Sequence, residues 1–144
     1  MTTEIIDYKP EYFPKLNEFW IETGLGGSYR GDTAEIINGT INSGGHLLMM
    51  INSETKEIIG TSWLTNDNRR TYLHHFGIRE KYRRQGLARQ LLNYSLQIAY
   101  NDGFQVKLEV HKDNIAAINL YQQFGFKYLG DYEVLIKREL PSIE

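Results

Sequence analysis

Hydrophobic and polar positions follow one another along the chain with two periods, which predict helices and strands. Apolar residues at a spacing of three or four predict amphipathic helices at residues 12–23, 33–41, 86–102 and 115–124. Alternating or unbroken apolar residues predict strands at residues 4–8, 46–52, 57–65, 70–78, 104–111, 126–129 and 133–140. The resulting order, β-α-α-β-β-β-α-β-α-β-β, predicts an α/β protein with a mixed α+β sheet in a single domain over residues 1–144.

Polar residues and glycines indicate where these helices begin and end. Asp32 followed by Glu35 has the spacing of a capping box, which predicts the start of the second helix. Asn114 predicts the N-cap of the last helix, and Gly125 predicts its end. Residues 24–32 contain four glycines in nine positions, so we expect a loop that can approach a ligand closely.

Composition limits the chemistry available to the chain. Its 144 residues fit one domain, and 41% of them are hydrophobic, so we expect a packed core. There are no cysteines, which excludes disulfides, thiolate metal sites and a cysteine nucleophile. The sequence shows neither a basic and apolar leader nor a long apolar run, which predicts a cytoplasmic protein that does not enter a membrane.

Positive charge is concentrated in one part of the chain. Residues 69–89 hold a single acid, Glu80, and seven basic residues: Arg69, Arg70, Arg79, Lys81, Arg83, Arg84 and Arg89. The whole chain nevertheless has a net charge of −2, so this segment either forms a solvated basic surface or meets an anion. A pI near 6.1 is low for a nucleic-acid-binding protein. A small phosphorylated ligand fits better.

A short loop at the start of the third predicted helix is the strongest candidate for binding that anion. It reads Arg83-Arg84-Gln85-Gly86-Leu87-Ala88 and follows a predicted strand. A helix N-terminus has free N–H groups and a partial positive charge, and the small residues Gly86 and Ala88 leave room for a phosphate. The loop lacks the Gly-Lys-Ser/Thr of a Walker sequence and the three glycines of a dinucleotide fingerprint.

Two motifs in this order resemble those of the GCN5-related N-acetyltransferase (GNAT) family. Arg83, Gly86 and Ala88 match the Arg/Gln-x-x-Gly-x-Gly/Ala pattern of motif A, although Ala88 replaces the more usual glycine. The run from Asn114 to Tyr121, followed by Gly125-Phe126, is similar to motif B. The resemblance covers residues 1–140. It implies a GNAT-like acyl-CoA N-acyltransferase fold, in which the fourth and fifth strands splay apart and acetyl-CoA lies between them.

The resemblance also implies which residues bind acetyl-CoA as the co-substrate. The phosphate loop, which is the segment from Arg83 to Ala88, would hold the pyrophosphate through its main-chain amides. These are the amides of Arg83, Arg84, Gln85, Gly86, Leu87 and Ala88. The main chain of Phe76, Gly77 and Ile78 would pair with the pantetheine arm like a short strand. Asn114, Ala117 and Tyr121 on the last helix would contact the cofactor arm.

Acetyl transfer to an amine needs a base for the amine and an acid for the departing thiolate. The resemblance makes Tyr121 the acid, while its position on an apolar stripe would also suit a core aromatic residue. The resemblance makes Glu109 the first choice of base, because its twelve-residue spacing to Tyr121 is similar to that of family members that acetylate ribosomal-protein N-termini. It makes His74 the second choice, because His74 matches a position where arylalkylamine acetyltransferases have a histidine. Side chains of adjacent strand residues diverge, so we expect His75 to pack elsewhere and we expect no metal site.

The acceptor is expected to be a primary amine, either a small cationic amine or a peptide N-terminus. Residues 1–35 hold three basic residues (Lys9, Lys15, Arg30) and seven acidic ones (Glu4, Asp7, Glu11, Glu18, Glu22, Asp32, Glu35), and this excess of acid favours a cationic substrate. Trp63 and Tyr72, with the 24–32 loop, would border the acceptor. The main alternative is an acyl-CoA-binding sensor module without catalysis. We expect no nucleic acid or membrane partner, and a monomer or homodimer.

Overall fold

The computed structural model describes residues 1–140 and contains one mixed five-stranded sheet. The strands run in the order β1-β2-β3-β4-β5 across the sheet. Neighbours are antiparallel except for the last pair, β4 and β5, which is parallel. The strand bounds are β1 Thr3–Asp7, β2 His46–Asn52, β3 Ile58–Asn66, β4 Arg70–Ile78 and β5 Gln105–Leu108. The predicted mixed sheet is therefore confirmed.

The chain divides into two compact units, which are described separately. The first, Met1–Glu109, holds the sheet and three helices: α1 (Phe13–Thr23), α2 (Ala34–Asn42) and α3 (Leu87–Asp102). Short 3-10 turns lie at Pro10–Tyr12, Ser28–Arg30 and Glu80–Tyr82. The second unit begins at Val110 and contains α4 (Ile115–Gln123). None of the helices within residues 1–140 is long and apolar enough to cross a membrane.

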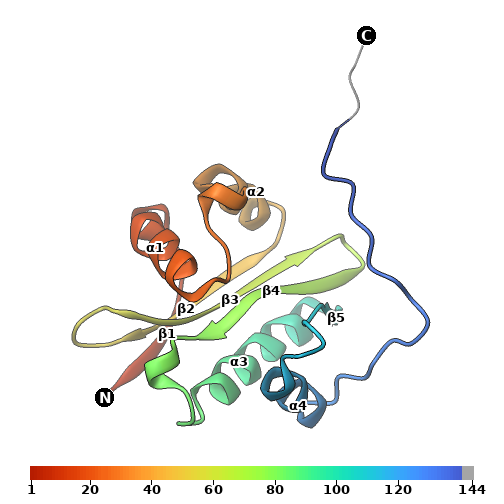
Figure 1. Cartoon of the computed structure of the whole chain (residues 1–144). Helices are drawn as coiled ribbons and strands as arrows, with labels where there is room; N and C mark the ends of the chain where they lie inside the picture. Colours follow the sequence, from red (N-terminus) through yellow and green to blue (C-terminus); the bar gives the residue numbers. More distant parts are fainter. Residues whose placement is uncertain (141–144) are drawn as a thin grey trace. The chain divides into compact units, whose positions relative to one another are not determined.

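Helices cover both faces of the sheet in the first unit: α1 and α2 lie on one face and α3 on the other (Figure 1). The consequence is clearest in β2, where Leu47 to Ile51 are all buried. Leu47 and Met49 belong to the hydrophobic cluster on the α1 and α2 face, whereas Leu48 and Met50 belong to the cluster on the α3 face. An unbroken apolar run is what a strand needs when both of its faces are covered.

A β-bulge interrupts the alternation of β4. Thr61 pairs with Gly77 and Trp63 pairs with His74, so β4 has one residue more than β3 between these two pairs. His75 lies at this point with a φ of 45°, in the left-handed region. Ile78, beyond the bulge, therefore packs in the cluster on the α3 face.

The fourth and fifth strands separate where the sequence analysis predicts. Arg70–Leu73 of β4 pair with Gln105–Leu108 of β5. In the described structure the pairing ends there, while β4 continues to Ile78 beside β3 alone. β4 therefore has a stretch of edge that faces no strand.

The structure differs from the predicted elements at three places. Thr33, and not Asp32, caps α2, and its hydroxyl accepts a hydrogen bond from the Ile36 amide at 3.2 Å. β5 is shorter than the predicted strand at 104–111. Residues 126–140 contain no strand, and Tyr128 and Leu135 there are about 90% exposed. Alternating side chains predict a strand only where another strand supplies backbone hydrogen bonds.

Candidate active site

The start of α3 has the geometry of an anion-binding loop. Gly86 is the N-cap of α3 with a φ of 77°, and no side chain caps the helix. Arg84 also has a positive φ, of 66°. Successive turns of this kind point main-chain N–H groups into one concavity, and the helix dipole adds positive charge. A Cβ built on Gly86 meets nothing within 4 Å, so the space beside this residue is open.

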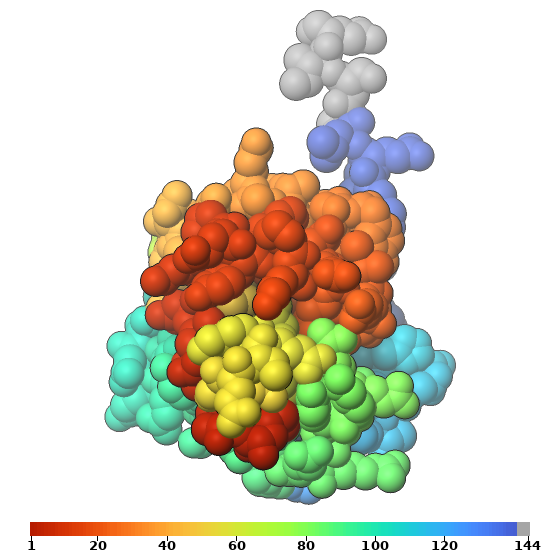
Figure 2. Space-filling view, turned by 90° about the vertical axis from the view of Figure 1, so that its left-hand side faces the viewer, coloured from red at the N-terminus to blue at the C-terminus, as the bar shows by residue number. Residues whose placement is uncertain are grey.

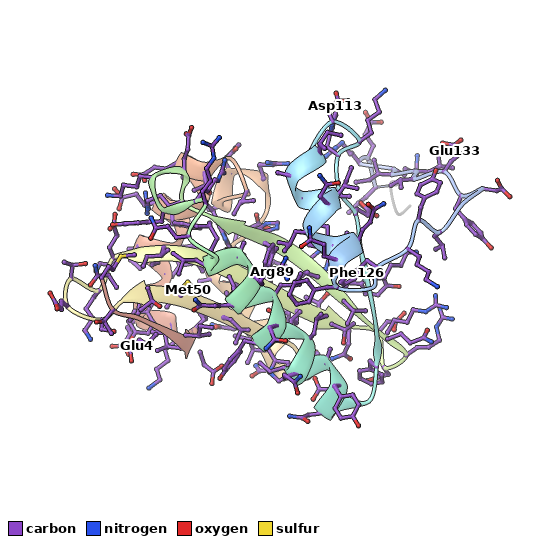
Figure 3. All side chains as sticks on the ribbon, turned by 90° about the horizontal axis from the view of Figure 1, so that it is seen from below. Glu4, Met50, Arg89, Asp113, Phe126 and Glu133 are labelled. Atoms are coloured by element: carbon purple, nitrogen blue, oxygen red, sulfur yellow. The ribbon has the colours of Figure 1, made fainter. Side chains whose placement is uncertain are left out.

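Arg83 anchors this loop to the end of β4. Its Nε donates a hydrogen bond to the carbonyl oxygen of Ile78 at 3.0 Å. The side chain therefore folds back onto the strand, and the main chain of residues 83–86 is held in place beside it. Figure 3 shows α3 from below, with Arg89 near its first turn.

Two of the basic residues in segment 69–89 are neutralised by acids that are distant in sequence. Glu57 lies 3.2 Å from Lys81 and 3.6 Å from Arg79, and it accepts a short hydrogen bond from the Tyr82 hydroxyl. Arg79 also pairs with Glu22 of α1. Figure 2 shows the turn before β3 (yellow) beside the segment near residue 80 (green).

The same contacts change the acidity of Glu57. The Tyr82 hydrogen bond, with Lys81 and Arg79, lowers the pKa of the Glu57 carboxyl from its usual 4.5. This network could not be predicted from the sequence, because only the fold brings Glu57 next to residues 79–82. The network fixes the turn that leads into the phosphate loop.

The two candidate bases, His74 and Glu109, lie together where β4 and β5 separate. Leu73 pairs with Leu108, His74 is the next residue of β4, and Glu109 is the first residue after β5; both His74 and Glu109 are exposed. They are close enough for the Glu109 charge to act on the His74 ring. The ring of His74 lies against that of Trp63, which packs in the cluster on the α1 and α2 face, so His74 faces away from α3.

The surroundings of His74 keep its imidazole neutral. Desolvation is the largest cause of its lowered pKa, and the charge of His75 adds to it, while Glu109 and Asp32 oppose the change. The pKa of His74 therefore lies below the usual 6.5. Its Nε2 lies 2.9 Å from the Thr65 hydroxyl. A neutral imidazole can accept a proton.

His75 is in contact with the same aromatic residue as His74. Its ring centroid lies 5.2 Å from that of Trp63, and the ring of His74 lies 6.2 Å from it. The sequence analysis expected adjacent strand residues to diverge, and the bulge at His75 makes that expectation wrong. Within residues 1–140, no three His, Cys, Asp or Glu side chains are grouped so that they could hold a metal ion.

Tyr72 and Trp63 differ in how accessible their side chains are to an acceptor. Trp63 is buried, with 4% of its surface exposed, and its indole N–H donates to the Thr40 hydroxyl at 3.0 Å. Tyr72 is partly exposed and stacks on His74, with ring centroids 6.3 Å apart. Trp63 is thus part of the core, and Tyr72 is the accessible residue of the two.

The remaining candidates, Asn114, Ala117 and Tyr121, belong to the second unit. Asn114 caps α4 as predicted, since its Oδ1 accepts a hydrogen bond from the Ala117 amide at 3.2 Å. Tyr121 is buried, and burial raises its pKa to about 12. Its ring packs edge-to-face with that of Phe126, with ring centroids 5.6 Å apart. Figure 3 labels Phe126. The phenol therefore keeps its proton at neutral pH.

Comparison with known proteins places this geometry in a family. Residues 10–126 match the model of the Acetyltransferase (GNAT) family. N-alpha-acetyltransferase 50 of Danio rerio is 32% identical over 80 residues, which are 54% of this chain and 48% of that protein. The Spermine/spermidine N(1)-acetyltransferase of Bacillus subtilis is 34% identical over 70 residues, 47% of this chain and 46% of the relative. The chain thus spans about half the length of these relatives.

Solved structures share the fold. A GNAT family acetyltransferase from Staphylococcus aureus superimposes with a TM-score of 0.75 and 24% identity, covering 88% of this chain and 84% of that one. A GNAT family acetyltransferase from Elizabethkingia anophelis, solved with acetyl-CoA bound, gives a TM-score of 0.59 and 22% identity over 87% of this chain and 76% of that one. On the family match over most of its length, this chain belongs to the GNAT family of acetyltransferases.

Proposed function

We propose that the chain is an N-acetyltransferase that moves an acetyl group from acetyl-CoA directly to a primary amine in a ternary complex. One observation carries this proposal: the unpaired edge of β4 leads into a helix N-terminus that no side chain caps. An unpaired strand edge can hydrogen-bond an extended amide chain. An uncapped helix N-terminus can bind a pyrophosphate. Acetyl-CoA has both groups in that order.

The residues present fit acetyl-CoA. The amides of Arg83 to Ala88 would hold the pyrophosphate, since the space above Gly86 is open. The main chain of Phe76 to Ile78 would pair with the pantetheine arm. The contacts of Asn114, Ala117 and Tyr121 with the cofactor rest on the resemblance of their motif to that of the family.

Two side chains, a base and an acid, would carry out the proton transfers. Acetyl-CoA, when bound, supplies an acetyl group activated as a thioester. Glu109 would take the proton of the acceptor amine, and His74 is the second candidate for this role. Tyr121 holds a proton at its hydroxyl and would donate it to the departing sulfur. The chain has no cysteine, so we expect no acetylated cysteine intermediate.

The acceptor we propose is a small cationic amine or a peptide N-terminus. The two relatives described above are named for these two kinds of acetyl transfer. Acidic residues outnumber basic ones in residues 1–35, but three of those acids are engaged: Glu4 with Lys56, Glu22 with Arg79, and Asp32 with His75. The attraction for a cation therefore rests on the other acids and on Glu109.

The proposal is tested with a panel of polyamines, lysine-like amines and peptide N-termini, assayed for release of free thiol from acetyl-CoA. We expect turnover with at least one cationic amine or peptide. Binding of acetyl-CoA without transfer to any acceptor would favour the sensor alternative. Absence of acetyl-CoA binding in calorimetry would contradict both.

Gly86→Asp tests the phosphate loop. A carboxylate at this position puts negative charge and bulk where the pyrophosphate would lie, so acetyl-CoA binding should be lost. Gly103→Asp is the matched control, because Gly103 caps the other end of α3 with a φ of 82° and similar open space. The control carries comparable backbone strain and should keep its acetyl-CoA affinity. Unchanged affinity in a folded Gly86→Asp variant would disprove the assignment.

A further inference from the structure

His75 connects the bulge of β4 to the loop of residues 24–32. Its Nε2 lies 2.7 Å from Oδ2 of Asp32, and the same carboxylate oxygen accepts a hydrogen bond from the Gly27 amide at 2.9 Å. A carboxylate only accepts hydrogen bonds, so the ring nitrogen donates. Asp32 thus joins the 24–32 loop to β4. The sequence pattern predicts a different role for Asp32, as the first residue of a capping box.

The ring and the main chain of His75 are also held by contacts with neighbouring residues. Its ring meets Trp20 edge-on at 4.8 Å and Trp63 at 5.2 Å between centroids. Its carbonyl oxygen accepts a hydrogen bond from the Thr61 hydroxyl at 2.7 Å, and that hydroxyl accepts one from the Trp20 indole at 3.0 Å. A residue that is not glycine keeps a φ of 45° only when its surroundings hold it there.

The loop packs directly against this pair. A Cβ built on Gly26 would collide with both Asp32 Oδ2 and His75 Nε2. A Cβ built on Gly77 would lie 2.9 Å from the Leu25 side chain. The glycines at positions 26 and 77 therefore allow the loop and β4 to approach each other closely on either side of the pair.

We propose that Asp32 and His75 are a positioning pair that fixes the 24–32 loop against the bulge and so preforms the acceptor side of the site. The inference rests on the proposed function, because it concerns where the acceptor amine binds. His74 follows the point where β4 leaves β5, and His75 follows His74. The charges of Asp32, His75 and Glu109 all act on the His74 ring. Moving the pair would move the loop relative to both candidate bases.

The first test separates acceptor binding from cofactor binding. Asp32→Ala removes the link, and we expect kcat/KM for the amine to fall about 10- to 100-fold, mainly through KM, because a displaced loop misplaces the acceptor. The Kd of acetyl-CoA, measured by calorimetry, should change less than about twofold, a difference below 0.5 kcal/mol. His75→Gln keeps a donor directed at Asp32 and should retain most of the activity.

A second His-Asp pair provides the control. His46 Nε2 lies 2.9 Å from Asp102 Oδ2 and joins the start of β2 to the end of α3, away from the 24–32 loop. Asp102→Ala should reduce stability without changing the KM of the amine. An equal KM effect in Asp102→Ala and Asp32→Ala would reduce the Asp32 effect to general destabilisation and overturn the inference.

A readout that needs no activity completes the test. Hydrogen exchange of the Gly27 amide should speed up at least about tenfold in Asp32→Ala, as expected when a hydrogen bond to a charged group is lost. The amides of β2 should be unaffected. Unchanged exchange at Gly27, or faster exchange with an unchanged KM, would overturn the inference. Failure of the proposed function would appear differently, as a wild-type protein that acetylates no amine.

Discussion

At the scale of single residues, Tyr121 combines a buried ring with a proton that is hard to remove. Burial raises its pKa to about 12 because the phenolate would lose its hydration. This matters in two ways. The phenol is protonated throughout the neutral range and can always donate a hydrogen bond. The same environment explains why its position in the sequence also matches that of a core aromatic residue.

Tyr121→Phe separates these two roles, because it removes the hydroxyl and keeps the ring. We expect the variant to fold and to bind acetyl-CoA, with kcat reduced at least about tenfold, since general acid catalysis contributes about 10² to 10⁴ in rate. Steady-state kinetics with a saturating amine measure the effect. A wild-type kcat would leave Tyr121 as a core residue only.

The choice between Glu109 and His74 can be made from pH profiles. A lysine-like amine with a pKa near 10.4 is almost fully protonated at pH 7 and needs a base. Glu109→Gln should therefore lower kcat/KM steeply near neutral pH, with recovery as pH rises and the amine loses its own proton. His74→Gln should have the smaller effect.

The lowered pKa of His74 determines the result that we expect if His74, and not Glu109, is the base. His74 becomes charged only below its usual 6.5, so a rate that His74 controls would fall on the acid side of that value. If this limb disappears in His74→Gln while Glu109→Gln behaves as wild type, His74 is the base.

At the scale of elements, the turn between β4 and α3 depends on Glu57. Glu57→Gln weakens the pairing with Lys81 and Arg79, and we expect a loss of a few tenths to about 1 kcal/mol in unfolding free energy, as for exposed pairs. The pKa of Glu57 is lowered by folding, so its contribution is complete above the unfolded value of 4.5 and is lost as pH falls through the folded value. Denaturant unfolding of both proteins at pH 7 and pH 3 measures this. An equal difference at both pH values would contradict it.

The sequence predicted the elements well wherever a local pattern determines them. The strands at 46–52 and 70–78 are confirmed at both ends, and so is the cap at Asn114. What the sequence could not predict depends on distant partners. The bulge at His75 depends on the pairing of β4 with β3. The network around Glu57 joins it to residues 22 to 25 positions away, and Asp32 is 43 positions from His75.

At the scale of the whole chain, charge is distributed unevenly in sequence and is partly neutralised in the fold. The basic segment 69–89 donates Arg79 and Lys81 to internal pairs. Arg84, in the phosphate loop, makes no ion pair with any of residues 1–140. The acids of residues 1–35 are also partly paired. The charge of the protein should therefore increase the rate at which substrates reach the site more than it increases their affinity once bound.

This view predicts a dependence on salt. If the acceptor is cationic, its kcat/KM should fall as ionic strength rises from about 0.01 M to 0.15 M, because the Debye length shrinks from about 30 Å to about 8 Å. A neutral amine of similar size is the control and should respond less. Equal responses would show that the acidic residues do not attract the acceptor.

The bulge in β4 also determines how this strand tolerates changes in its length. Before the bulge, even-numbered side chains such as His74 face away from α3. After it, Gly77 faces Leu25, and Phe76 and Ile78 pack on the α3 face. Even-numbered side chains of β4 therefore face away from α3 before His75, and odd-numbered positions do so after it. Deleting His75 would restore strict alternation and leave the candidate base His74 and the core residue Ile78 on their present faces, because the bulge adds only one residue to β4. A gap at this position in an alignment would therefore mark a strand that lacks the bulge and the contact of His75 with Asp32, with His74 and Ile78 on unchanged faces.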